Sequence, residues 1–67
     1  MSKLFDKKFG HEVALRIGDE IVSRWGDRFT IDGYSVLDAQ KDVVGTLMDG
    51  NFYNRFGALM AVEGANS

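Results

Sequence analysis

The stretch VVGTLMDGNFYNRFGALM, residues 43–60, decides the expected fold, because it joins two apolar segments through Asp49-Gly50. The first segment continues an apolar stripe that begins near Val36, which predicts a helix over about residues 36–48. Asn51 can cap a second helix over about residues 52–63. The apolar side chains of that helix would fall within an arc of about 120°: Phe52, Tyr53, Phe56, Leu59 and Met60. The pattern therefore predicts a helical hairpin that closes at Asp49-Gly50.

Two helices joined by a tight turn can also bind DNA as a helix-turn-helix. A recognition helix presents several basic or amide side chains to base edges and phosphates. The outward side of the second helix would offer only Asn54 and Arg55, and Asp49 at the turn has the wrong charge to face phosphate. The sequence therefore favours a structural corner, and we do not expect nucleic acid as a partner.

Upstream, HEVALRIGDEIVSRWG (residues 11–26) has the clearest apolar periodicity in the chain. Apolar residues recur at spacings of three and four, which is typical of an amphipathic helix: Val13, Ala14, Ile17, Ile21 and Trp25. Glu12–Arg16 and Glu20–Arg24 have the i,i+4 order that supports a helix. A short helix before Gly10 would place Phe5 and Phe9 against this one.

Residues 27–35, DRFTIDGYS, allow two interpretations. Asp32-Gly33 between apolar residues indicates a two-residue hairpin that pairs Ile31 with Tyr34 and Phe29 with Val36. Each arm would have only about three residues, and an isolated hairpin is marginally stable in water. We therefore expect an ordered loop around residues 27–34, with a two-stranded mini-hairpin at residues 29–36 as the alternative.

Together these segments predict an all-α fold, a small bundle of three to four helices in a single domain over residues 1–67. An α+β fold with the mini-hairpin is the alternative. We recognise no internal repeat, low-complexity tract or linker. The expected core comprises Leu15, Ile17, Ile21, Trp25, Val43, Leu47, Phe52, Phe56 and Leu59.

Composition argues against most chemistry. The 67 residues are 45% hydrophobic and 27% charged, as in an ordinary globular domain. The chain has no cysteine and one histidine, His11, which removes disulfides, thiolate sites and thiol nucleophiles. It also lacks a phosphate-binding glycine loop and an apolar run long enough to cross a bilayer. We therefore expect no enzymatic activity, cofactor, metal or membrane partner, and a cytoplasmic location, in the host cell if the protein is phage-encoded.

The charge is unevenly distributed along the chain. Residues 1–28 carry a net charge of +1 and residues 29–67 carry −3. The outward side of the last expected helix is small and nearly neutral, so another protein or a second copy could approach it closely. The candidate partner-binding residues are Asp38, Asp42, Asp49, Tyr53, Asn54, Gly57, Ala58 and Ala61.

The leading hypothesis is a non-enzymatic binding protein that occupies a surface of a protein partner. Small domains without cofactor chemistry are common among phage and mobile-element inhibitors of host proteins, and the acidic second half could compete for a basic surface on such a host protein. The alternative is a helical homo-oligomeric assembly protein, such as a homodimer. A small helix-turn-helix regulator is the least favoured.

Overall fold

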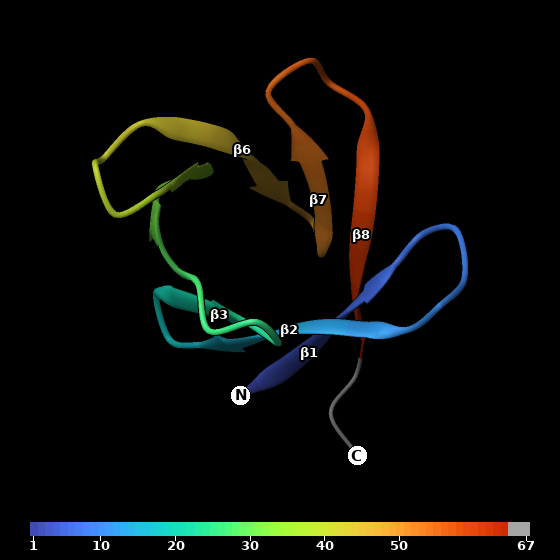
Figure 1. The fold of residues 1–67 in the computed structure, drawn as a ribbon. Coiled ribbons are helices and arrows are strands. Elements are labelled where there is room, and N and C mark those ends of the chain that lie inside the picture. The colour runs from blue at the N-terminus through green and yellow to red at the C-terminus, as the bar shows by residue number, and fades with distance from the viewer. Residues whose placement is uncertain (65–67) are drawn as a thin grey trace.

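A computed structural model of the chain describes residues 1–64, which form eight antiparallel strands closed into a barrel (Figure 1). Each strand pairs with the next, and β8 pairs with β1. In chain order the strands are β1 (Ser2–Asp6), β2 (Glu12–Ile17), β3 (Glu20–Ser23), β4 (Arg28–Asp32), β5 (Ser35–Leu37), β6 (Val43–Met48), β7 (Asn51–Asn54) and β8 (Leu59–Gly64). The expected all-α bundle and the α+β alternative are both wrong, because residues 1–64 contain no helix.

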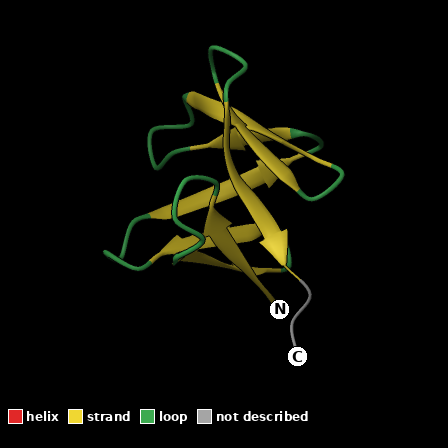
Figure 2. Cartoon of the chain, turned by 90° about the vertical axis from the view of Figure 1, so that its right-hand side faces the viewer, coloured by secondary structure: helices red, strands yellow, loops and turns green. Residues whose placement is uncertain are grey.

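Closure of the barrel joins the two ends of the described chain. Phe5 of β1 lies opposite Val62 of β8, and Lys3 lies opposite Gly64. Figure 2 shows the start of β1 and the end of β8 at the same end of the barrel. Closure leaves none of the eight strands with an unpaired edge, so strand addition is not an available binding mode.

The long helix expected over residues 11–26 is in fact the hairpin of β2 and β3. A spacing of four residues places side chains on one face of a strand as well as a helix, because the strand period is two. Gly18 has a φ of 60°, which lies outside the right-handed helical region and turns the chain between the strands. The periodicity was genuine, but it came from two strands.

The helical hairpin expected over residues 36–63 is a run of strands from β5 to β8. Asp49 and Gly50 have φ values of 54° and 78°, as in the two-residue turns that suit a hairpin. The turn at this position is confirmed, but it joins β6 to β7 rather than two helices. The helix-turn-helix is therefore absent, and the helical form of the assembly protein is wrong as well.

Residues 29–36 do form a hairpin, between β4 and β5. Ile31 pairs with Val36 and Asp32 with Ser35, so the turn lies at Gly33-Tyr34 rather than Asp32-Gly33. The arms are short, as expected. They are stable because each is also paired on its other side, β4 with β3 and β5 with β6.

The barrel is a fourfold internal repeat that we did not recognise in the sequence. Each odd strand is joined to the next even strand by a loop that opens with a short polar residue, at intervals of 15 to 17 residues: Asp6, Ser23, Asp38 and Asn54. The side-chain oxygen of that residue accepts backbone N–H hydrogen bonds in all four loops. Each loop also contains one residue with positive φ: Gly10, Gly26, Lys41 and Gly57.

The core follows the same repeat. Two residues before each loop, a large apolar side chain packs in the barrel: Leu4, Ile21, Val36 and Phe52. In three of the four hairpins this residue lies opposite a small one: Ala14, Gly45 and Ala61. Opposite residues of an antiparallel pair share a face of the sheet, so large and small side chains alternate around the interior.

The expected core is only partly correct. Ile21 and Leu47 are buried, and Phe52 packs against the core. Leu15 and Leu59 are partly buried. The remaining four residues of the expected core are exposed, because they lie in loops or next to turns: Ile17, Trp25, Val43 and Phe56.

Candidate binding site at the loop end of the barrel

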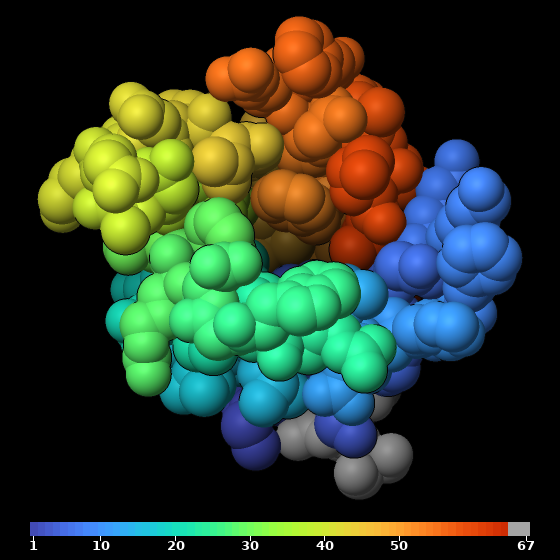
Figure 3. Space-filling view, viewed as in Figure 1, coloured from blue at the N-terminus to red at the C-terminus, as the bar shows by residue number. Residues whose placement is uncertain are grey.

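The four loops of the repeat lie at one end of the barrel, because strand direction alternates and each loop connects an odd strand to an even one. We call residues 6–11, 23–27, 38–42 and 54–58 the tip loops. Figure 3 shows them set around one face of the molecule, with a hollow between them. The two-residue turns lie at the opposite, turn end, together with the start of β1 and the end of β8.

The first residue of each tip loop fixes the loop's backbone. Asn54 Oδ1 accepts hydrogen bonds from the backbone N–H groups of Phe56 at 2.9 Å and Ala58 at 3.0 Å. Asp38 Oδ1 accepts from Gln40 and Asp42, both at 2.9 Å. These hydrogen bonds give the backbone N–H groups of each loop a partner within the loop itself. The side chain at the tip is therefore free to project outward.

The first tip loop is one residue longer and is held by Asp6 Oδ1, which accepts from the N–H groups of Phe9, Gly10 and His11. The hydrogen bond from Phe9 is the main reason that the pKa of Asp6 lies below its usual value of 3.8. A carboxylate with a lowered folded-state pKa stabilises the fold above its unfolded pKa. That contribution is lost as the pH falls through the folded-state pKa, so this loop should loosen only in acid.

Three of the tip loops present a basic side chain next to an aromatic ring. The Lys8 ammonium lies 5.3 Å from the centre of the Phe9 ring. The guanidinium carbons of Arg24 and Arg55 lie 5.7 Å and 5.2 Å from the rings of Trp25 and Phe56. The three aromatic residues are 68%, 73% and 82% exposed: Phe9, Trp25 and Phe56. The third tip loop, residues 38–42, has Ala39-Gln40 at the corresponding position.

The charge asymmetry lies between the two ends of the barrel as well as between the chain halves. The tip loops contain five bases and four acids, a net charge of +1, and the rest of the chain contains three bases and six acids, a net charge of −3. The bases of the tip loops are Lys7, Lys8, Arg24, Lys41 and Arg55. The loop end is therefore weakly basic and the turn end acidic.

A cavity of about 470 Å³ lies inside the loop end of the barrel. Inward side chains from all eight strands line it, and almost all of them are apolar. Ser23, Trp25 and Asp27, at the second tip loop, complete the lining. An eight-stranded barrel is just wide enough either to be filled by its own side chains or to hold one small ligand.

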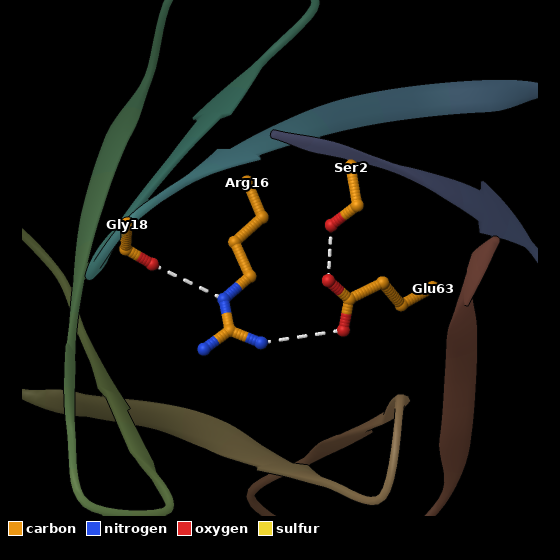
Figure 4. Close-up of polar contacts among 4 residues, drawn as sticks. All are labelled: Ser2, Arg16, Gly18 and Glu63. Carbon is orange, nitrogen blue, oxygen red and sulfur yellow. Dashed lines mark hydrogen bonds and ion pairs between the residues drawn. The ribbon is translucent and has the colours of Figure 1, made fainter. Parts of the chain in front are cut away.

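The turn end of the interior is closed by polar contacts instead (Figure 4). Arg16 Nη1 lies 3.3 Å from Glu63 Oε1, and Arg16 Nε donates to the carbonyl of Gly18 at 3.2 Å. The Ser2 hydroxyl donates to Glu63 Oε2. Ile31 and Leu47 occupy the corresponding places in the other two repeats and are buried. In the first and fourth repeats, the Arg16–Glu63 ion pair thus occupies the places that Ile31 and Leu47 fill in the second and third.

Replacing Glu63 alone should therefore lower the free energy of unfolding more than replacing both Arg16 and Glu63. Glu63→Leu is expected to lower the free energy of unfolding by about 1–3 kcal/mol, because Arg16 loses its partner in a partly buried place. Arg16→Leu combined with Glu63→Leu should restore stability to within about 1 kcal/mol of the wild type or exceed it. Urea denaturation of the three proteins measures this, and a double variant less stable than Glu63→Leu would contradict it.

The structure distributes the candidate partner-binding residues over the barrel. Asp38, Asp42, Asn54, Gly57 and Ala58 all lie in the tip loops. The other three do not: Asp49 is in a turn at the opposite end, Tyr53 is partly buried on β7, and Ala61 is buried inside the barrel. The helix face that was expected to unite Gly57, Ala58 and Ala61 does not exist.

From the sequence we expected Trp25 and Phe56 in the core and Phe9 packed against a helix, so the exposed aromatic residues were missed. The signal was present as a base, an aromatic residue and a glycine at residues 8–10, 24–26 and 55–57. In residues 1–64, no three His, Asp or Glu side chains gather as a metal site would require. The same residues include no helix of the length and apolarity that a membrane span needs. No family model, curated protein or solved structure matches the chain.

Proposed function

We propose that the protein is a non-enzymatic binding protein that contacts a protein partner through its tip loops. The observation that carries this proposal is the presence of three exposed base–aromatic pairs at one end of the barrel. Tryptophan and arginine dominate the binding energy of protein interfaces, and aromatic residues are enriched at them. Because these rings are exposed, they contribute little to the core, so binding is the more economical reason for their position.

Mixed charge at the loop end favours a protein over a phosphate-rich surface. Nucleic acids and anionic membranes present continuous negative charge and are bound by strongly basic faces. Here Asp27 and Asp42 lie among the bases, and the tip loops have a net charge of only +1. A protein surface with acidic and apolar groups of its own would complement this pattern, and salt should weaken the interaction.

The acidic residues of the second half of the chain, among them Asp32, Asp38, Asp42 and Asp49, do not lie at one end of the barrel. Asp38 and Asp42 lie at the loop end, whereas Asp32 and Asp49 lie next to the turns at the opposite end. These four carboxylates therefore cannot contact one basic surface together. We therefore propose a protein partner that contacts the base–aromatic pairs rather than these carboxylates.

A triple substitution tests the contact. Phe9→Ser, Trp25→Ser and Phe56→Ser together should lower affinity for the partner at least 100-fold, because interface aromatic residues often contribute about 2 kcal/mol or more each. Stability should change little, since the rings are exposed. The control replaces three exposed apolar residues at the turn end: Ile17→Ser, Tyr34→Ser and Met48→Ser. Capture of a partner from cell extract, followed by calorimetry with the purified partner, gives the affinities.

Retention of the partner by the triple tip variant would contradict the proposal, as would an equal loss in the turn-end control. Light scattering on the isolated protein separates a partner from self-association. A wild-type dimer that becomes a monomer in the tip variant would make a second copy the occupant of this surface. Binding of the wild type to single-stranded DNA or to anionic vesicles at moderate salt would replace the protein partner by a phosphate surface.

A further inference from the structure

We propose that the cavity in the loop end of the barrel is a binding site for a small apolar alcohol. This inference goes beyond the proposed function, because it rests on the interior of the barrel rather than on its outer tips. The volume of the cavity, about 470 Å³, lies within the range of roughly 300–1,000 Å³ that is typical of small-molecule sites.

The cavity exists because the repeat places small residues on the inner wall. Ala14 and Ala61 line it opposite the larger Leu4 and Phe52. Protein interiors are usually packed with few voids larger than a water molecule, so a hollow of this size is unusual for a 67-residue chain. Small-molecule sites are lined mainly by apolar and aromatic side chains, as this one is. The lining therefore selects an apolar ligand body.

The mouth of the cavity selects the ligand's polar group. Ser23 Oγ accepts the N–H groups of Trp25 at 3.2 Å and Asp27 at 3.0 Å, which fixes both residues at the rim. A serine hydroxyl also has one hydrogen to donate, whereas an ionised aspartate only accepts. Within residues 1–64 the Asp27 carboxylate makes no ion pair.

An alcohol matches both rim groups, because its oxygen can accept from Ser23 while its hydrogen is donated to Asp27. A carboxylate ligand would be repelled by Asp27. An ammonium ligand would be attracted by Asp27 but repelled by Arg24, which does not line the cavity but has its guanidinium over the Trp25 ring at the rim. A neutral hydroxyl is the group that neither Asp27 nor Arg24 repels.

Trp25 is the only tryptophan of the chain and lines the cavity mouth, so its fluorescence reports occupancy directly. The probes are 1-decanol, decanoate and decylamine, titrated below their aggregation concentrations, with calorimetry as a second measurement. We expect saturable one-to-one binding of 1-decanol, with decanoate and decylamine each at least tenfold weaker. Asp27→Asn should reduce the preference over decanoate, because the repelling charge is removed.

Two substitutions fill the cavity from different places. Ala61→Leu adds volume at the inner wall and Val44→Phe adds it from β6. Each should weaken 1-decanol binding at least tenfold in a protein that still melts cooperatively, and Val44→Phe provides the test if Ala61→Leu does not fold. Ala58→Leu, on an exposed part of the last tip loop, is the matched control and should bind as the wild type does.

Absence of saturable 1-decanol binding by both methods would overturn the proposal, as would unchanged binding in a folded cavity-filling variant. Equal affinity for the three probes would overturn the assignment of an alcohol. The test is separate from that of the protein partner. The cavity-filling variants keep all three base–aromatic pairs, so they should still bind the partner if the proposed function is correct.

Discussion

Ile21→Ala is expected to lower the free energy of unfolding by about 2–5 kcal/mol, whereas Ile17→Ala should change it by less than about 1 kcal/mol. The two isoleucines are four residues apart, but Ile21 is 4% exposed and Ile17 is 49% exposed. Ile21 points into the barrel from β3, where its truncation removes core contacts and enlarges the cavity that it lines. Ile17 ends β2 beside the Gly18-Asp19 turn, where alanine leaves none. Urea denaturation of each variant gives both values.

Leu4→Ala is the matched test within the repeat. Leu4 occupies in β1 the place that Ile21 occupies in β3, and it is also buried, so its truncation should cost a similar free energy. A helix over residues 11–26 would bury Ile17 and Ile21 on one stripe. Equal losses of stability for Ile17→Ala and Ile21→Ala would therefore contradict the barrel. A helical far-ultraviolet circular dichroism spectrum would contradict it independently.

Ile17 and Ile21 also show why the sequence led to the prediction of a helical fold. Apolar residues four apart satisfy the period of a helix and the period of a strand, and strands of three to six residues are too short for strict alternation to dominate. Gly18 and Gly57, inside the expected helices, were the contrary signal, because glycine is unfavourable in a helix interior. The turn at Asp49-Gly50 and the hairpin near residues 29–36 were readable because their turn residues are specific.

Barrel closure could not be predicted from local patterns. The pairing of β1 with β8 joins residues at opposite ends of the sequence, and no local periodicity specifies it. The repeat was obscured because its first tip loop has one extra residue. The β3–β4 hairpin also lacks the register shift that the other three hairpins have. Unequal repeats of 15 to 17 residues do not align by a fixed offset.

The candidate site was predictable in part. Three base–aromatic–glycine triplets could be read from the sequence, but the helical interpretation placed Trp25 and Phe56 in the core and Phe9 against a helix. The third tip loop has Gln40 and Lys41 in place of the aromatic residue and the glycine, and this exception hid the repeat of the triplet. The cavity depends on which side chains face one another across a closed barrel. It could be recognised only after the register of all eight strands was known.

Gly45→Ala is expected to destabilise the protein by about 3 kcal/mol or more, as overpacking against a backbone that cannot move does. A Cβ atom on Gly45 would lie 2.7 Å from ring carbons of Phe52, and it would also collide with the carbonyl oxygen of Tyr53. That carbonyl belongs to β7, which is paired on both sides, so moving it would disturb two neighbouring strands. Thermal and urea unfolding measure the loss.

Gly57→Ala separates this steric effect from backbone strain. Gly57 has a φ of 87°, which disfavours alanine, but a Cβ there would meet no atom within 4 Å. Its substitution should cost only about 1–2 kcal/mol. Adding Phe52→Leu to Gly45→Ala should recover part of the loss, because it removes the ring contact and leaves the collision with the Tyr53 carbonyl. A Gly45→Ala protein as stable as the wild type would show that β6 and β7 do not approach this closely, and the alternation of large and small residues around the barrel would then be wrong.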